Sequence, residues 1–302
     1  MMDLKSPSKA TNEDRRGRII TYSCIGIIIV LVVSILYFIA SRGLATFIQN
    51  HVNVFRFLTG TQWNPSLLDS HGQPEVGALP MITTSFLVTI LAAIVATPFA
   101  FAVAIYMVEI APKRGTKLLQ PVMELLVGIP SVVYGFIGLT VIVPIVRHIF
   151  GGTGVGILAG TLVLFVMILP TVTSLSVDAL TAVPMYLRSA SLALGATRWQ
   201  TIRKVILRAA MPRLLTAIIF GMARAFGEAL AVQMVIGNAA LMPTSLVSPT
   251  STLTSQLTTE VGNTVMGTIQ NNALWSLALI LLLMSLVFNL LVHFIGKRGE
   301  IK

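Results

Sequence analysis

Six long stretches without a charged residue constrain this chain more than any other feature. A helix needs roughly 20 apolar residues to cross the hydrocarbon core of a bilayer. The charge-free stretches are 19–41, 76–108, 125–146, 148–177, 229–259 and 261–296. With their polar ends trimmed, they predict spans near 19–40, 84–108, 121–146, 155–176, 214–236 and 273–295. We therefore expect an all-α integral membrane protein with six transmembrane helices.

The composition excludes the common soluble classes. Only 11% of the 302 residues are charged and 55% are hydrophobic, whereas about a quarter of a soluble domain is charged. The net charge of +10 comes from short basic clusters between apolar stretches, so we expect the lipid bilayer and not nucleic acid as a partner. The chain has no GxxxxGK(S/T) phosphate-binding loop and no His/Cys group at metal-ligand spacing. We therefore expect neither an ATPase site nor a metal site nor a cofactor in this chain.

The basic residues predict the orientation in the membrane. Most of the 21 Lys and Arg residues lie in the N-terminus, the connections after the second and fourth spans, and the C-terminus. Cytoplasmic loops carry such an excess, so both termini are expected in the cytoplasm. We expect residues 1–18 to form a disordered cytoplasmic tail, 19–296 the six-helix domain, and 297–302 a short cytoplasmic tail.

The two long outer connections leave alternatives open. Residues 41–83 include FLTGTQWNPS, which we expect to fold against the outer membrane surface or to place Trp63 in an aromatic interface belt. Residues 237–272 are rich in Ser, Thr and Asn. They are compatible with a docking site for a soluble partner, a re-entrant segment or a featureless loop.

Arg224 and Glu228 are the strongest functional signal from the residues themselves. They lie four positions apart near the middle of the fifth predicted span, where each charge costs on the order of 2.5–3.5 kcal/mol. On one continuous helix they would share a face and lie close enough to pair. This arrangement is typical of an anion path, although a purely structural ion pair between helices is the alternative.

The third predicted span carries residues that favour a kink and close helix packing. It contains GIPSVVYG, with Gly128, Pro130, Ser131, Tyr134 and Gly135. Glycines let helices approach each other, and proline frees a backbone carbonyl that a neighbouring helix can satisfy. We interpret these residues as packing or gating positions. Nearby Glu124 is interpreted as a charge at a helix N-terminus or, less simply, as a ligand.

The basic loop before the fifth span, residues 186–212, predicts a helix, a turn and a second helix. The first helix covers Ser189 and Ala190 and is ended by Gly195, and Ala196, Thr197 and Trp199 lead into TIRKVIL. Such an amphipathic surface fits two roles. It can rest on lipid headgroups, or it can dock a cytoplasmic motor.

The loop and three further motifs resemble a known family. The loop is similar to the EAA loop of ABC-importer permeases, and GIPSVVYGFIGL, FLTGTQWNP and ARAFGEALAVQMVIGN resemble the C-type permease subunit of bacterial phosphate (Pst) importers, within the MetI-like type I importer permeases. The resemblance covers the chain after residue 18. The chain departs from the pattern in having Ser189 where the loop usually has Glu, and Arg208 where it usually has Pro.

The resemblance implies a function and a set of partners. The chain would pair with a homologous A-type permease to form a phosphate path in a bacterial cytoplasmic membrane. A cytoplasmic ATPase dimer would bind ATP and Mg, grip the loop at residues 189–199, and drive transport of phosphate delivered by an extracytoplasmic binding protein. Arg224 and Glu228 would line the path. A permease for sulfate or molybdate, and a self-sufficient anion channel or secondary transporter, are the alternatives.

Overall fold

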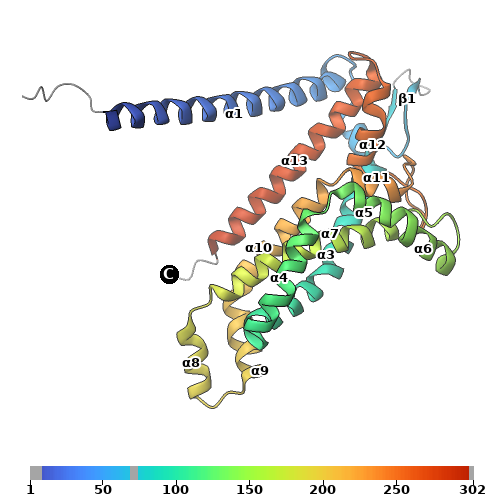
Figure 1. Ribbon diagram of the computed structural model, residues 1–302. Helices are drawn as coiled ribbons and strands as arrows, with labels where there is room; N and C mark the ends of the chain where they lie inside the picture. The colour runs from blue at the N-terminus through green and yellow to red at the C-terminus, as the bar shows by residue number, and fades with distance from the viewer. Residues whose placement is uncertain (1–8, 69–73, 299–302) are drawn as a thin grey trace, which may run out of the picture.

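The computed structural model describes residues 9–68 and 74–298 as a helical bundle from which one long helix diverges (Figure 1). Within these ranges, six helical segments are long and apolar enough to cross a membrane. They are Glu13–Ile48, Leu79–Ile110, Ser131–Phe150, Ile157–Thr181, Arg198–Phe226 and Ile269–Leu291. The predicted number and order of spans are confirmed, and the third and fifth spans differ in their limits.

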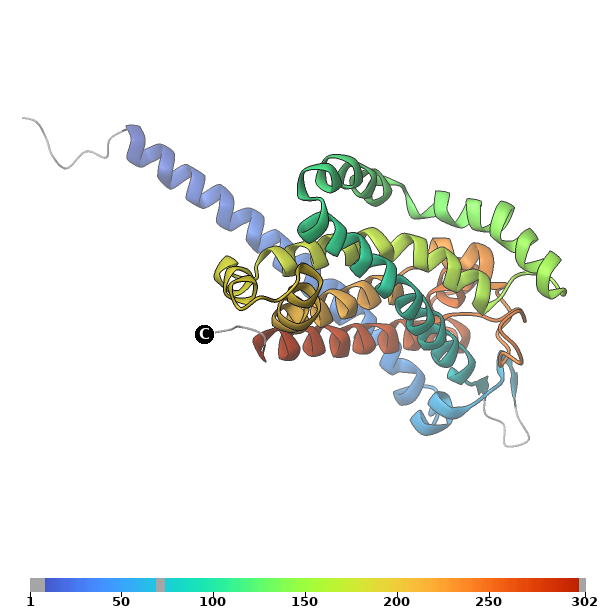
Figure 2. The same ribbon diagram turned by 90° about the horizontal axis from the view of Figure 1, so that it is seen from below.

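The first helix, α1 (Lys9–Ile48), stands away from the bundle along most of its length (Figures 1 and 2). None of its most apolar window is buried within this chain. It joins the bundle near its C-terminal end, where the Ser276 hydroxyl donates a 2.7 Å hydrogen bond to the Gly43 carbonyl. A Cβ at Gly43 would lie 2.9 Å from the Trp275 carbonyl oxygen, so glycine permits this close approach.

The expected disordered tail is partly wrong. Residues 1–8 lie outside the described part of the chain, but residues 9–18 continue α1. The side chains of Asp14 and Arg18 are 3.5 Å apart, one helical turn from each other. Such pairs support a helix that is already propagating from its apolar part.

The outer connection after α1 is folded on the bundle. It contains α2 (Val54–Thr59) and an antiparallel hairpin of β1 (Trp63–Leu68) and β2 (Pro74–Val76), in which Trp63 pairs with Val76. The Phe57 side chain is fully buried and its ring centroid lies 6.3 Å from that of Trp63. Trp63 is half-buried and packs on the outer segment through this contact, and its place in an aromatic interface belt stays a prediction.

Helices α3 (Leu79–Ile105) and α7 (Ile157–Thr181) form the centre of the bundle. Ala92 and Ala96 of α3 are fully buried in a cluster that includes Leu164 and Ile168 of α7. The small alanines let the two backbones approach closely, as in other membrane helix pairs. Helix α10 (Leu207–Phe226) packs on both, and α13 (Ile269–Arg298) packs on α10 and α1.

The chain between the second and third spans begins with a widened helical turn. Residues Tyr106–Ile110 form a π-helical segment, η1, that extends α3, and the amphipathic α4 (Pro112–Gly128) follows it. The spanning part of this region is α5 (Ser131–Ile137), η2 (Gly138–Ile142) and α6 (Val143–Phe150). The predicted single span 121–146 is therefore wrong in its first ten residues: 121–128 belong to α4, and Ile129 and Pro130 form the break before α5.

The fifth span begins earlier than predicted and is interrupted. Helix α8 (Met185–Ala193) leads to α9 (Arg198–Thr201), the π-helical η3 (Ile202–Ile206) and α10 without a gap after α9. Helix α10 ends at Phe226, and α11 (Leu230–Ile236) is a separate short helix. We call the end of the bundle with α8 and α9 the inner end, and the opposite end the outer end (Figure 1).

The outer connection 237–272 is neither featureless nor loosely attached. It contains α12 (Leu253–Glu260) and the 3-10 turn η4 (Val261–Asn263). Residues 250–256 are all buried. The Thr252 hydroxyl caps α12, and the Ser85 hydroxyl of α3 accepts a 2.9 Å hydrogen bond from the Leu253 N–H. Its many hydroxyls therefore satisfy buried backbone and side-chain partners at the outer end.

Candidate functional site

The predicted helix–turn–helix at the inner end is confirmed. Helix α8 ends before Gly195, whose φ of 80° lies in the left-handed region that favours glycine. The Thr197 hydroxyl then accepts from the Gln200 N–H at 3.3 Å, and the Gln200 side chain accepts from the Thr197 N–H at 2.9 Å. This reciprocal capping box fixes the start of the second helix.

The outward face of this loop is apolar and exposed. Leu194 is 88% exposed and Trp199 is 58% exposed. Ser189 and Ala190 are exposed as well, while Ala196 is half-buried. The loop face also carries the exposed large side chains Met185, Tyr186 and Leu192. Clusters of exposed apolar side chains on a polar loop are typical of an interaction surface.

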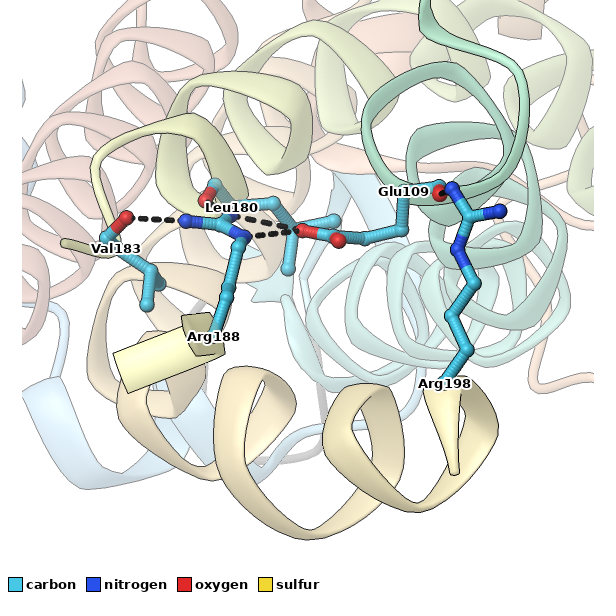
Figure 3. A network of polar contacts seen from close by, with 5 residues as sticks. All are labelled: Glu109, Leu180, Val183, Arg188 and Arg198. Carbon is cyan, nitrogen blue, oxygen red and sulfur yellow. Dashed lines mark hydrogen bonds and ion pairs between the residues drawn. The ribbon is translucent and has the colours of Figure 1, made fainter. Parts of the chain in front are cut away.

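The inward face of the loop is held by a polar network that we call the inner junction: Glu109, Leu180, Val183, Arg188 and Arg198 (Figure 3). The Arg188 guanidinium donates to Glu109 Oε1 through Nε at 3.1 Å and Nη2 at 2.7 Å. It also donates to the carbonyls of Val183 at 2.5 Å and Leu180 at 2.9 Å. Arg198 donates through Nη2 to the Glu109 carbonyl. Three separate chain segments therefore meet at Glu109.

The charges of the inner junction are buried, which makes breaking the junction costly in free energy. The side chains of Arg188 and Glu109 are only 14% and 10% exposed. Taking one charge away from a buried pair leaves the other without compensation, which costs about 3–5 kcal/mol in soluble proteins. Leu180 and Val183 lie at the C-terminal end of α7 and just beyond it. Arg188 thus adds side-chain donors to carbonyls at a helix end, where intrahelical donors become few; the Leu180 carbonyl also accepts from the Val183 N–H at 3.2 Å.

Arg224 lies in the last turn of α10 and points to α7. Its Nη1 donates to the Thr171 hydroxyl, and Thr171 lies near the middle of α7. Arg224 is half-buried. Although α10 ends two residues later, Arg224 is therefore level with the central part of a spanning helix. Its location deep in the membrane-spanning region agrees with the prediction.

The predicted pairing of Arg224 with Glu228 is wrong. No ion pair joins the two side chains, both of which lie in the described part of the chain. The helix breaks at Gly227, so the one-turn spacing expected of a continuous helix is lost. Glu228 Oε1 instead accepts from the Ala231 N–H at 3.2 Å at the start of α11. A carboxylate there is favoured by the N-terminal end of the helix dipole.

The break before the third span lies at Pro130, as the sequence predicted. The preceding residue, Ile129, has φ −70° and ψ 128°, the extended conformation that proline imposes on its neighbour. The Tyr134 hydroxyl, in α5, donates to the Leu126 carbonyl of α4 at 2.7 Å. Tyr134 therefore bridges the break, and Ser131 begins the second helix.

The glycines of this span differ in their surroundings. A Cβ on Gly135 would lie 2.9 Å from Ala231 Cα, so α5 packs closely on α11. A Cβ on Gly138 would lie 2.5 Å from Val163 Cγ2 of α7. The close approach expected at Gly135 is confirmed, and Gly138 lies in an equally close contact. At Gly128 no atom of the described residues lies within 4 Å of such a Cβ, so the close packing expected there is not made within this part of the chain.

A cavity of about 430 Å³ lies between η1, α4 and α7, toward the inner end. Its wall includes Met107, Glu124 and Asp178. Glu124 accepts a 2.9 Å hydrogen bond from Gln120, one turn earlier in α4. The interpretation of Glu124 as an N-terminal helix charge is wrong, because α4 begins at Pro112 and Glu124 lies near its C-terminal end. Among the described residues, no group of three or more His, Cys, Asp or Glu is placed to hold a metal ion.

The bundle and its helix–turn–helix loop define a class of protein, the permeases of type I importers. The chain resembles a subunit in a structure of the MetNI methionine ABC transporter, with a TM-score of 0.53 and 21% identity over 70% of this chain and 93% of that one. It also resembles a chain in a crystal structure of an amino acid ABC transporter, with a TM-score of 0.52 and 19% identity over 72% of this chain and 92% of that one. These likenesses establish the fold.

The sequence comparisons establish the family. Residues 96–300 match the family model described as "Binding-protein-dependent transport system inner membrane component". A probable ABC transporter permease protein, YqgH of Bacillus subtilis, is 53% identical over 96% of this chain and 93% of its own length. The phosphate transport system permease protein PstC of Pasteurella multocida is 34% identical, with 77% of each chain covered. The chain belongs to this family of membrane permease subunits of ABC transporters.

Sequence reasoning missed the inner junction. Glu109 is the acid that ends the second apolar stretch, and Arg188 opens the basic loop. The orientation argument puts both at the same membrane surface, so opposite charge at equal depth was an available signal. Their partnership was still not predictable, because 79 positions separate them and only the fold brings the ends of the second and fourth spans together.

Proposed function

We propose that this chain is one of two permease subunits of an ATP-driven importer that moves inorganic phosphate across a bacterial cytoplasmic membrane. The observation that carries the proposal is Arg224, a half-buried cation level with the middle of α7 in a chain related to phosphate permeases. A guanidinium carries a permanent positive charge and several N–H donors, and phosphate oxygens are bound by such a cation. Within the described part of the chain, Thr171 is the hydrogen-bond partner recorded for the Arg224 side chain.

Glu228 has a different part in this proposal from the one its spacing suggested. Its side chain holds the start of α11, and its carbonyl accepts a 2.8 Å hydrogen bond from the Thr254 hydroxyl of α12. Glu228 therefore fixes the turn that follows Arg224 and links this turn to α12 at the outer end. Because the carboxylate does not neutralise Arg224 directly, the guanidinium keeps its charge for an anion.

The exposed face of the loop 186–212 is proposed to bind an ATPase subunit on the cytoplasmic side. Leu194 and Trp199 supply apolar contact area, and Ser189 supplies a hydroxyl where the family pattern has a carboxylate. The contact would therefore depend on shape and apolar burial more than on an acidic side chain. Resting on lipid headgroups is the competing role, and capture of the ATPase by the detergent-solubilised permease separates the two.

Membership of the family supports a proposal for the full assembly. We propose a homologous permease as the second membrane subunit, a cytoplasmic ATPase dimer that binds ATP and Mg, and an extracytoplasmic phosphate-binding protein. The positive-inside pattern supports cytoplasmic termini. The helix–turn–helix loop lies at the inner end and would face the ATPases. Packing of Gly135 and Gly138 against α11 and α7 would let the third span move with the turn that follows Arg224.

Uptake of labelled phosphate by cells or proteoliposomes with the assembled transporter tests the function. Arg224→Gln is expected to lower uptake about 10- to 100-fold, because a hydrogen bond to a charged group contributes about 1.5–3 kcal/mol. Arg213→Gln changes an exposed arginine of the same helix and serves as the matched control. Normal uptake by an assembled Arg224→Gln transporter contradicts the proposal. Stronger inhibition of uptake by unlabelled sulfate or molybdate than by phosphate would assign the path to another oxyanion.

A further inference from the structure

We propose that the Arg188–Glu109 pair is the transmission point through which the loop moves the inner ends of the second and fourth spans. The proposal rests on the proposed function in one respect, namely that an ATPase acts on α8. It assigns positioning roles to two side chains that lie away from Arg224. It concerns the coupling of ATP hydrolysis to transport, not recognition of the anion.

Helix α8 has few other attachments to the bundle. None of its residues is buried, and Leu187, Arg188 and Ser191 are its half-buried members. Leu187 packs against a cluster of buried apolar side chains at the inner end. The Ser191 hydroxyl lies 2.9 Å from the hydroxyl of Thr201, in the second helix of the same loop. Within the described part of the chain, the directional bonds from α8 to the second and fourth spans are therefore those of Arg188. Without them, displacement of α8 would be absorbed by the short chain between α7 and α8.

Arg188 contacts two spans at once. Its Nη1 and Nη2 donate to the carbonyls of Val183 and Leu180 at the end of α7, and its Nε and Nη2 donate to Glu109 at the end of the second span (Figure 3). A planar guanidinium with donors on several edges can make these contacts together, whereas a single point charge cannot. The contacts tie the ends of α7 and η1 to one side chain of α8.

The second helix of the loop holds the same residue. Arg198, the first residue of α9, donates to the backbone carbonyl of Glu109, while Arg188 binds its carboxylate. Both helices of the loop are thus bonded to Glu109. Because α9 continues through η3 into α10, movement of the loop also reaches the helix that carries Arg224.

The segment that contains Glu109 is suited to transmit a displacement. It is the π-helical η1, in which the Ala111 N–H donates to the Tyr106 carbonyl, five residues earlier, at 2.9 Å. Such widened turns are uncommon and are frequently found at functional sites. Segment η1 and α7 also form walls of the 430 Å³ cavity beside α4. Moving their ends relative to α4 would therefore change this cavity.

The test measures phosphate transported per ATP hydrolysed by the complete transporter in proteoliposomes. The first variant is Glu109→Gln, which keeps the side-chain shape and removes the charge. The second is the double variant Glu109→Gln with Arg188→Met, which removes both charges and so avoids an uncompensated buried one. The matched control is Asp14→Asn, which breaks the exposed pair with Arg18 on α1.

We expect both junction variants to assemble and hydrolyse ATP while the ratio of phosphate transported to ATP hydrolysed falls about tenfold, equivalent to about 1.4 kcal/mol of coupling. Glu109→Asp, which restores the carboxylate, should recover part of the ratio, and the control should equal the unmodified protein. An unchanged ratio in both junction variants overturns the proposal, including the case in which only the amount of assembled complex falls. If the unmodified transporter itself moves no phosphate, the proposed function fails instead.

Discussion

Arg188 and Arg224 are both arginines shielded from water within a membrane protein, and their surroundings differ in kind. Arg188 has a carboxylate and two backbone carbonyls as partners, with its side chain 14% exposed. Arg224 is half-buried, and within the described part of the chain its side chain donates to one neutral partner, the Thr171 hydroxyl. Its expected partner, Glu228, is engaged at the start of α11.

The difference indicates two roles for the same side chain. A guanidinium whose charge is compensated and whose donors are used holds elements in place and has little capacity for a ligand. A guanidinium with donors to spare in a low-dielectric region attracts an anion, and it binds weakly enough for release when no cluster of further cations assists it. Each of the following variants tests one side of this contrast.

The largest effect on folding is expected at the inner junction. Glu109→Ala leaves the Arg188 charge buried without its counterion, which should lower the free energy of unfolding by about 3–5 kcal/mol. The measurement is thermal unfolding of the purified permease in detergent, monitored by loss of the monodisperse fraction. A change no larger than that of an exposed substitution would show that Arg188 is solvated by other means and would weaken the contrast.

A smaller effect, on transport, is expected when Arg224 loses its hydroxyl partner. Thr171→Val keeps the side-chain shape and should lower phosphate uptake about 2- to 10-fold, since a hydrogen bond contributes about 0.5–1.5 kcal/mol. Thr97→Val is the matched control, because the Thr97 hydroxyl bonds the Ala93 carbonyl of its own helix at 2.7 Å. If the two variants transport equally well, Thr171 does not orient Arg224.

Glu228→Gln tests directly whether Arg224 and Glu228 pair. Glutamine can still accept from the Ala231 N–H, so the change should cost only about 0.3–1 kcal/mol of stability, the contribution of a charge at a helix N-terminus. A buried ion pair would instead lose about 3–5 kcal/mol. Measuring the unfolding of Glu228→Gln and Glu109→Ala side by side distinguishes the two cases. Equal losses of stability would show that Arg224 and Glu228 do pair, despite the break at Gly227.

The smallest effect is expected for the exposed reference pair. Asp14 and Arg18 are 74% and 67% exposed in their side chains, and such surface pairs contribute about 0–1 kcal/mol. Asp14→Asn should leave both stability and uptake within error of the unmodified protein. A large loss of transport would mean that the N-terminal part of α1 has contacts outside this chain.

Local signals in the sequence predicted much of the architecture. Charge-free stretches located the spans because the bilayer requires long apolar helices. Gly195 and Thr197 correctly located the turn in the loop, since both act through backbone geometry within a few residues. Pro130 correctly located the break before α5 for the same reason.

The features that the sequence did not reveal depend on distant contacts. The sequence around Gly227 contains no proline that would mark the end of α10. The separate helix α11 depends instead on packing against α5 and α7. The pairing of Glu109 with Arg188 needs the ends of two spans brought together. The folded state of residues 250–256 depends on polar partners such as Ser85 on α3. Periodicity within a short window carries none of this information.

The most direct test of the contrast substitutes lysine for each arginine in the same reconstituted transporter. Lysine keeps the charge as a compact ammonium group, but its three donors share one nitrogen and do not reproduce the planar fork that contacts a carboxylate and two carbonyls. Phosphate transported per ATP hydrolysed should be largely retained in Arg224→Lys and should fall markedly in Arg188→Lys, with ATP hydrolysis continuing in both. The reverse pattern, with Arg188→Lys coupled normally and Arg224→Lys inactive, would contradict the assignment of Arg224 to the anion and Arg188 to transmission.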